Sequence, residues 1–158
     1  MSEKNSNSAV QQLAQPGPEH ARLNIFIGQW INEGYTVASA DAPAVKILTS
    51  DVYAWMPGGF FVLHTAYGRI GEQDVGGTEI IGYDAARKKY LSYFYNSQGS
   101  FTISEFTIQG DVCTWTEEKT RCTAYFTEQG KVQTAHHEQL NEAGQWEPSM
   151  NVTLIKVT

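Results

Sequence analysis

The sequence contains few cysteines and no long apolar segment. Only two of its 158 residues are cysteine, Cys113 and Cys122, and their spacing does not fit the C-x2-C pattern of zinc sites and redox pairs. No stretch approaches the roughly eighteen consecutive apolar residues of a membrane-spanning helix. The first residues also lack the apolar segment of a secretory signal. We therefore expect a cytoplasmic protein that has no membrane partner and keeps both thiols reduced.

Positive charge and the common catalytic motifs are also scarce. Eleven Lys and Arg residues stand against seventeen Asp and Glu residues, which gives a net charge of −6 and argues against a nucleic-acid partner. The sequence has no G-x-S-x-G, no phosphate-binding loop, no H-E-x-x-H and no dinucleotide-binding glycine motif. We therefore predict no metal site and no resident cofactor. The expected partner is a small molecule.

Length and composition predict a single globular domain. A chain of this length, with 41% hydrophobic and 18% charged residues, buries about 70% of its unfolded surface around one core. Residues 1–16 are polar, rich in Ser, Asn and Gln, and without periodicity, which predicts a disordered tail. Residues 17–158 then form the folded domain.

A short helix is predicted at the start of this domain. Pro18 suits a first helical turn, and Leu23, Phe26 and Ile27 recur at the spacing of one helix face. Gly28 is a typical C-terminal stop. Because such a short helix is unstable alone, its apolar face must pack against the rest of the domain.

Beyond this helix, strand-forming residues predominate. Tyr, Phe, Trp, Val, Ile and Thr are frequent, and turn residues recur at roughly every eight to twelve positions. The predicted strands cover residues 29–38, 43–56, 60–69, 74–83, 88–97, 100–109, 111–117, 120–128, 131–140 and 145–157. All the connections are short, so strands that follow one another in the sequence should pair antiparallel.

A meander of about ten strands has two exposed edges unless it closes on itself. No crossover helix is predicted, which excludes doubly wound and TIM-type folds. We therefore expect an all-β fold, an antiparallel up-and-down β-barrel of about ten strands, with the short N-terminal helix capping one end. A two-sheet sandwich is the alternative.

Three short motifs occur in an order shared with a known family. Gly28-Gln29-Trp30 forms a G-x-W motif, Pro57-Gly58-Gly59-Phe60 begins a later strand, and Gly82-Tyr83-Asp84 precedes Lys89-Tyr90 across a hairpin. This order resembles a bacterial, lipocalin-like (calycin-type) family of unknown function that is distantly similar to the nitrobindin haem barrels. The resemblance implies a barrel with a central cavity and with Trp30 in its floor. Through the nitrobindins it also implies haem as an alternative occupant.

A turn at residues 117–118 would fix the faces of two neighbouring strands. In that register Cys113 opposes Cys122, and Trp115 opposes Thr120. The apolar face should point inward. It carries Cys113, Trp115, Cys122, Ala124 and Phe126.

The next hairpin decides which of two adjacent histidines faces inward. A two-residue loop at Gln129-Gly130 places Cys122 opposite His137, whereas a three-residue loop places it opposite His136. Successive side chains on a strand point to opposite faces, so only one of the pair enters the barrel. His137 is our candidate, and the other register would bring in His136 instead.

Two further titratable residues have only uncharged residues beside them in the sequence. His64 lies in the otherwise uncharged run of residues 60–67, and Glu79 is flanked by uncharged residues. If both face inward, they form either an acid–base pair or a buried ion pair. The candidate catalytic residues are therefore His64, Glu79 and His137.

Aromatic residues are numerous enough to line the interior. On the strand at 88–97, Tyr93 and Tyr95 share one face, while Tyr90 and Phe94 share the other. Buried phenols need hydrogen-bond partners, which favours a cavity with some polar groups over a solid core. The predicted ligand-binding residues are Tyr53, Trp55, His64, Glu79, Tyr93, Tyr95, Trp115, His137 and Met150.

These features favour a binding protein. Side chains can fill a barrel of about eight strands, whereas a barrel of about ten leaves room for a guest. The leading hypothesis is binding of a small, largely apolar or aromatic molecule in the lumen. The alternatives are a cyclase, isomerase or hydrolase that uses lumen His, Glu or Tyr residues, and haem binding through one inward histidine. Exposure of Phe60, Val62 or Tyr125 would favour a homodimer.

Overall fold

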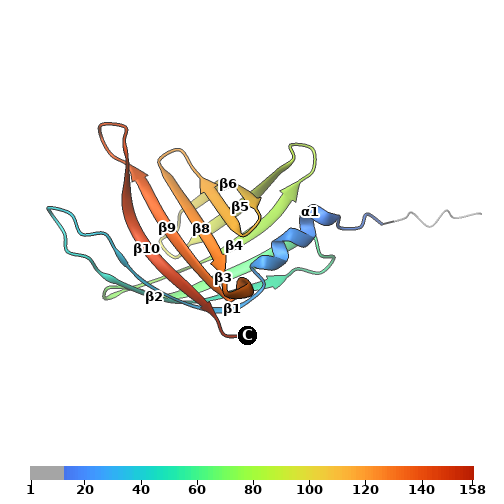
Figure 1. Ribbon diagram of the computed structural model, residues 1–158, viewed down its shortest axis with the longest axis horizontal. Coiled ribbons are helices and arrows are strands. Elements are labelled where there is room, and N and C mark those ends of the chain that lie inside the picture. The colour runs from blue at the N-terminus through green and yellow to red at the C-terminus, as the bar shows by residue number, and fades with distance from the viewer. Residues whose placement is uncertain (1–12) are drawn as a thin grey trace, which may run out of the picture.

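Ten antiparallel strands form a closed barrel (Figure 1). The computed structural model describes residues 13–158, so most of the predicted tail, residues 1–16, lies outside the described residues. Each strand pairs with its neighbours in the sequence, and the first strand pairs with the last to close the barrel. The strands are β1 (Gly28–Thr36), β2 (Lys46–Trp55), β3 (Phe61–Ile70), β4 (Gln73–Asp84), β5 (Lys89–Asn96), β6 (Phe101–Gln109), β7 (Val112–Thr116), β8 (Thr120–Thr127), β9 (Val132–Leu140) and β10 (Trp146–Lys156). The predicted up-and-down barrel is confirmed.

Two of the hairpins show how turn residues end the strands. Between β4 and β5, the Asp84 carboxylate accepts hydrogen bonds from the backbone N–H groups of Ala86 and Arg87, at 3.0 and 3.1 Å. Between β6 and β7, Gly110 adopts a positive φ of 60°, which a side chain would disfavour. Local turn chemistry of this kind sets the strand lengths.

A short helical segment packs against one end of the barrel. It consists of α1 (Pro18–Ala21) followed by the 3-10 turn η1 (Arg22–Ile25), rather than one continuous helix to Ile27. Leu23 and Phe26 are fully buried. The segment therefore caps the barrel with its apolar face, as its sequence pattern predicts.

Trp30 lies in the floor of the barrel. Its side chain is fully buried, and its indole N–H donates a hydrogen bond of 2.8 Å to the carbonyl oxygen of Phe26. The ammonium group of Lys156 lies 4.7 Å from the centre of the Trp30 ring, within the range of a cation–π contact. The buried core surrounds this floor and includes Leu23, Phe26, Trp30, Ile108, Cys113, Phe126 and Leu154.

The register between β7 and β8 differs from the predicted one by two residues. Trp115 opposes Cys122, and Cys113 opposes Ala124, so the two cysteines do not face each other and both are free. The reason is a longer loop, which the backbone N–H of Glu117 closes by donating to the carbonyl oxygen of Thr120. Because a shift of two keeps every side chain on its face, the inward set was still predicted correctly.

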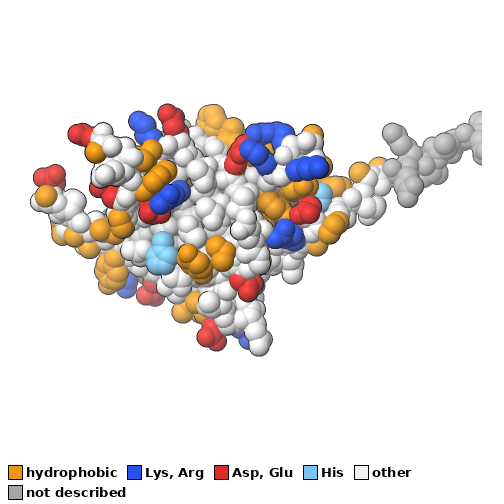
Figure 2. Space-filling model, turned by 45° about the horizontal axis from the view of Figure 1, so that its top comes forward, with side chains coloured by type: hydrophobic (Ala, Val, Ile, Leu, Met, Phe, Trp, Pro, Cys, Tyr) orange, Lys and Arg blue, Asp and Glu red, His pale blue; other side chains and the backbone are white. Residues whose placement is uncertain are grey.

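The outer surface mixes hydrophobic and charged side chains (Figure 2). Of the residues whose exposure would favour a homodimer, Tyr125 is exposed, Phe60 is partly buried and Val62 is fully buried inside the barrel. The homodimer stays a prediction. Within residues 13–158, no helix is both long and apolar enough to span a membrane.

Candidate functional site

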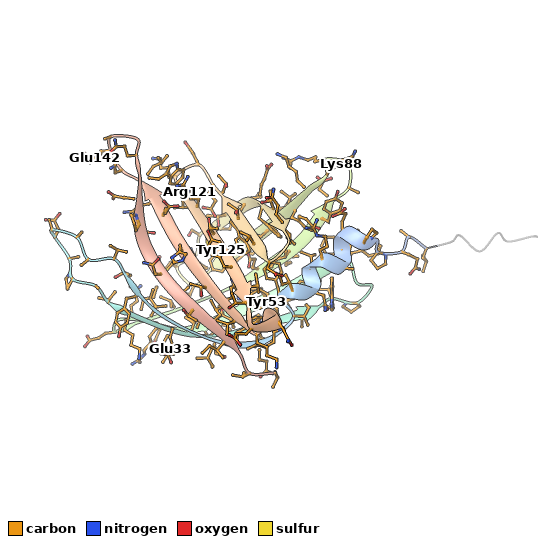
Figure 3. The ribbon with its side chains drawn as sticks, in the orientation of Figure 1. Glu33, Tyr53, Lys88, Arg121, Tyr125 and Glu142 are labelled. Carbon is orange, nitrogen blue, oxygen red and sulfur yellow. The ribbon has the colours of Figure 1, made fainter. Side chains whose placement is uncertain are left out.

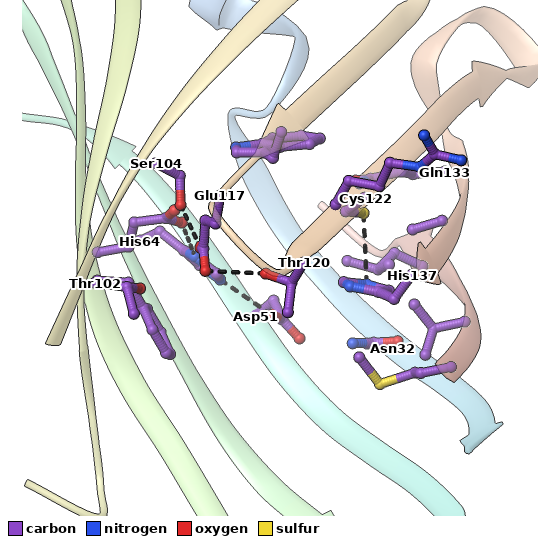
Figure 4. A pocket seen from close by; sticks show the side chains of 18 of the residues that line it. Asn32, Asp51, His64, Thr102, Ser104, Glu117, Thr120, Cys122, Gln133 and His137 are labelled. Carbon is purple, nitrogen blue, oxygen red and sulfur yellow. Dashed lines mark hydrogen bonds and ion pairs between the residues drawn. The ribbon is translucent and has the colours of Figure 1, made fainter. Parts of the chain in front are cut away.

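The barrel encloses a cavity of about 410 Å³ that all ten strands line. This volume lies within the usual range of small-molecule sites. The barrel is therefore not filled by its own side chains. Figure 4 shows two groups of polar side chains on facing sides of the cavity, one around His64 and one around His137.

Cross-strand pairing places three of the predicted residues side by side. Tyr53 of β2 opposes His64 of β3, His64 opposes Glu79 of β4, and Glu79 opposes Phe94 of β5. Residues directly opposite each other on adjacent strands point to the same face of the sheet. Together they make one inward row across four strands, and Tyr53 lies inside the barrel (Figure 3).

His64 is held between two carboxylates. Its Nδ1 lies 2.8 Å from Oε2 of Glu79, and its Nε2 lies 3.0 Å from Oδ1 of Asp51. Asp51 is a diagonal neighbour on β2, two residues before Tyr53, and its second oxygen accepts a 2.6 Å hydrogen bond from the hydroxyl of Thr49. The Tyr53 ring stacks on the imidazole with centres 3.8 Å apart.

This arrangement makes His64 a cation at neutral pH. Burial by itself lowers the pKa of His64, but the hydrogen bonds to Asp51 and Glu79 outweigh it and raise the pKa to about 9. Both ring N–H groups then donate to carboxylates, and the stacked Tyr53 ring also favours the positive charge. Burial, together with Glu79 and Asp51, raises the pKa of the Tyr53 phenol well above its usual value, so Tyr53 stays neutral.

The facing side of the cavity carries a second inward row, formed by Trp115, Cys122, His137 and Met150. Sγ of Cys122 lies 3.5 Å from Nε2 of His137. Burial, together with the neighbouring His136, lowers the pKa of His137 to about 4, and burial raises the pKa of Cys122 to about 12. A neutral imidazole beside a thiol is not the ion pair of an activated cysteine nucleophile.

The β8–β9 pairing resolves which histidine faces inward. Cys122 opposes His137, the register of the two-residue loop. The connection itself is longer, since it contains the 3-10 turn η2 (Glu128–Gly130), in which Glu128 and Gln129 have positive φ. His136 is exposed, and its Nδ1 lies 2.7 Å from Oδ1 of Asn151.

Polar side chains also surround the cavity near the β7–β8 hairpin. The hydroxyl of Thr120 donates a 2.9 Å hydrogen bond to Glu117, and the hydroxyl of Ser104 donates to the other oxygen of the same carboxylate. The guanidinium of Arg121 donates two hydrogen bonds to Glu138, at 2.6 and 3.0 Å. Glu117 thus has hydroxyl partners, while Arg121 is engaged by a carboxylate.

The structure brings most of the predicted ligand-binding residues to the cavity. Those that line it are Tyr53, His64, Glu79, Trp115, His137 and Met150. The prediction was wrong for Trp55, whose indole N–H donates to Asn24 in the capping segment, and for Tyr93 and Tyr95, which are 40% and 51% exposed on the outer face. On the outer face Tyr93 pairs with Ile103, and Tyr95 pairs and stacks with Phe101. Phe94, between them on β5, points to the opposite face and lines the cavity.

Among the polar residues of the cavity that the sequence did not predict are Asn32, Asp51 and Gln133. Asp51 carried a usable signal, since it shares a face with Tyr53 by strand alternation. Asn32 likewise shares a face with Trp30. The inward position of Gln133 follows from the same alternation once His137 is placed inward, because the two are four residues apart on β9.

The fold and the internal polar cavity define a lipocalin-like barrel. The chain belongs to the family described as "Protein of unknown function (DUF1579)", whose model matches residues 15–156. This agrees with the lipocalin-like family of unknown function that its motifs resemble. None of the curated proteins matches the sequence.

Two solved structures share this fold at low sequence identity. The crystal structure of Rv2717c from M. tuberculosis superposes with a TM-score of 0.65 at 12% identity, covering 90% of this chain and 99% of that one. The S-type phycobiliprotein lyase CPES from Guillardia theta superposes with a TM-score of 0.60 at 8% identity, covering 89% and 93%. At these identities the likeness shows the fold alone.

Proposed function

We propose that the protein binds a small molecule with an aromatic or apolar body inside the barrel. The cavity of about 410 Å³ carries this proposal. Its lining combines large apolar side chains, Phe94, Trp115 and Met150, with many polar ones, so an apolar body can pack inside while polar groups of the ligand find partners. The likeness of the barrel to a phycobiliprotein lyase is in keeping with a role that involves a small molecule.

Blocking the cavity should weaken binding. Thr102 lines the cavity opposite Phe94 and is itself exposed, so a Thr102→Trp substitution adds a large ring there without disturbing the buried core. We expect the uncharged fluorophore N-phenyl-1-naphthylamine to bind the wild type saturably with increased emission. We expect Thr102→Trp to bind it at least tenfold more weakly, which fluorescence titration measures.

Ile103→Trp is the matched control, because Ile103 is the next residue on β6 and is exposed on the outer face. It should bind the fluorophore like the wild type. Circular dichroism verifies that both variants are folded. Absence of saturable binding to the wild type, or equal binding by the two variants, would contradict the proposed function.

Proton transfer to a bound molecule is the second candidate function. The observation that favours it is the convergence of Asp51, His64 and Glu79 within hydrogen-bonding distance on one wall. Because both ring nitrogens of His64 face carboxylates, a carboxylate oxygen of Glu79 or Asp51 would have to exchange the proton. A ligand identified by native mass spectrometry should then take up deuterium from D₂O with the wild type and not with Glu79→Gln. Equal uptake with both proteins would exclude this role for Glu79.

Haem does not fit the inward histidines as they are arranged. Both nitrogens of His64 are occupied by carboxylates, and Nε2 of His137 faces the Cys122 sulfur. Within the described part of the chain, no group of three or more His, Cys, Asp or Glu side chains is placed to hold a metal ion.

A further inference from the structure

Negative charge exceeds positive charge around the cavity. Among the described residues that line it are four carboxylates, those of Asp51, Glu79, Glu117 and Glu138, and two cations, His64 and Arg121. His64 is enclosed by Asp51 and Glu79, and Arg121 is held by Glu138 through two hydrogen bonds. Neither cation is therefore left to meet an anionic ligand, while the Glu117 carboxylate has only hydroxyl partners.

Two amide side chains in the cavity form no side-chain hydrogen bond with another described residue, and one of them has a buried oxygen atom without a partner. Oδ1 of Asn32 is buried and accepts no hydrogen bond from any described residue. Gln133 is only 6% exposed, and none of the side-chain hydrogen bonds within residues 13–158 involves its amide. The two residues flank Leu154, which pairs with Asn32 on one side and with Gln133 on the other. A buried hydrogen-bond acceptor left unpaired is destabilising, so Asn32 Oδ1 should be satisfied by a donor from a bound molecule.

The unpaired acceptor and the negative charge lie close together. Asn32 opposes Thr49 on β2, which places it on the diagonal from Asp51, two residues further along the same strand. Diagonal neighbours on one face lie about 7–8 Å apart, within reach of a single small group between them. A ligand group that carries several N–H donors and a positive charge would satisfy the unpaired Asn32 oxygen and also balance the nearby negative charge.

We infer that the ligand is a small organic cation, with an ammonium, amidine or guanidinium group on an aromatic or apolar body. This inference rests on the proposed function and narrows it to one chemical class. The charged group donates to Asn32 Oδ1 and lies near the carboxylates of Asp51 and Glu79. The body packs against Phe94, Trp115 and Met150, where an aromatic face also attracts the positive charge.

Three probes with the same indole ring and different charges test this inference. Tryptamine is cationic at pH 7, tryptophol is neutral, and indole-3-acetate is anionic. Calorimetric titration of the wild-type protein should show tryptamine binding at least tenfold more tightly than tryptophol. Indole-3-acetate should bind more weakly than tryptophol, because its carboxylate would enter a site that already has excess negative charge.

Removing one cavity carboxylate should reduce this preference. Glu79→Gln should lower the tryptamine-to-tryptophol affinity ratio at least threefold, because it removes one negative charge from the cavity wall. Glu117→Gln provides a second variant outside the buried cluster, so the test does not depend on Glu79→Gln folding. Glu33→Gln is the matched control, because Glu33 points away from the barrel (Figure 3) and its loss changes the net charge equally. Its affinity ratio should equal that of the wild type.

The outcomes separate this inference from the proposed function. Equal binding of tryptamine and tryptophol, or tightest binding of indole-3-acetate, overturns the cation inference and leaves the binding function intact. The same holds if N-phenyl-1-naphthylamine binds and none of the indoles does. If neither the fluorophore nor any indole binds, the proposed function fails together with the inference.

Discussion

Raising the pH from 6.5 to about 9 should lower the free energy of unfolding by about 3 kcal/mol through His64 alone. The pKa of His64 is raised from 6.5 to about 9 in the folded protein. Between these values the folded state keeps a proton that the unfolded state has lost. Stability from this group is therefore complete below pH 6.5 and is lost as the pH rises to about 9. One pKa unit corresponds to about 1.4 kcal/mol, which gives the expected magnitude.

Urea unfolding at intervals between pH 6.5 and 9 measures this loss. His64→Gln should be less stable at pH 6.5 and should show a flatter profile, because it has no imidazolium to lose. His136→Gln, at the exposed neighbour of His137, should keep the wild-type slope. Near the upper end of this range the thiols of Cys113 and Cys122 ionise in the unfolded chain, while burial keeps both protonated in the folded protein. This contribution is the same in the wild type and in both variants, so it does not affect the difference between their slopes. An NMR titration that gives the His64 imidazole a pKa near 6.5 in the folded protein would contradict the prediction.

Most of the fold could be predicted because its signals are local. Strand-forming residues separated by short turns predict hairpins, and a chain of hairpins with no crossover predicts antiparallel neighbours. Closure of the barrel could be predicted because an open meander would leave the backbone N–H and C=O groups of its two edge strands unpaired. The β7–β8 register could not be predicted in the same way, since Glu117 and Glu118 have no turn preference strong enough to distinguish a two-residue loop from a longer one.

The cavity was harder to predict than the fold. β5 has aromatic side chains on both faces, so the pattern of Tyr93, Phe94 and Tyr95 does not indicate which face is inward. The structure resolves this through pairing, because Glu79 of β4 opposes Phe94. An inward pair of His64 and Glu79 was predicted as one possibility. The third member, Asp51, depends on the β2–β3 register, which places it on the diagonal from His64.

Sequence patterns also could not reveal the charge of the cavity. His64 and His137 are both inward histidines, yet one is a cation and the other is neutral. The difference comes from partners on neighbouring strands. Two carboxylates flank His64, whereas His137 has a thiol and the neighbouring His136. Such partners are set by strand register and not by local composition, which is why the inference about the ligand's charge rests on the structure and not on the sequence.

Replacing Phe26 with alanine should lower the free energy of unfolding by about 3–5 kcal/mol. Phe26 is 1% exposed, and it joins the capping segment to the barrel interior. Its ring centre lies 5.8 Å from that of Tyr53, 5.8 Å from that of Trp115 and 5.6 Å from that of Phe126. These rings belong to three different strands and cannot all move into the space left, so the substitution creates a cavity in the floor.

Chemical denaturation at pH 6.5 measures this effect, with Phe101→Ala as the matched control. Phe101 is 64% exposed, so the same substitution there should cost less than about 1 kcal/mol. A loss below 1 kcal/mol for Phe26→Ala would show that the capping segment is not part of the cooperative core.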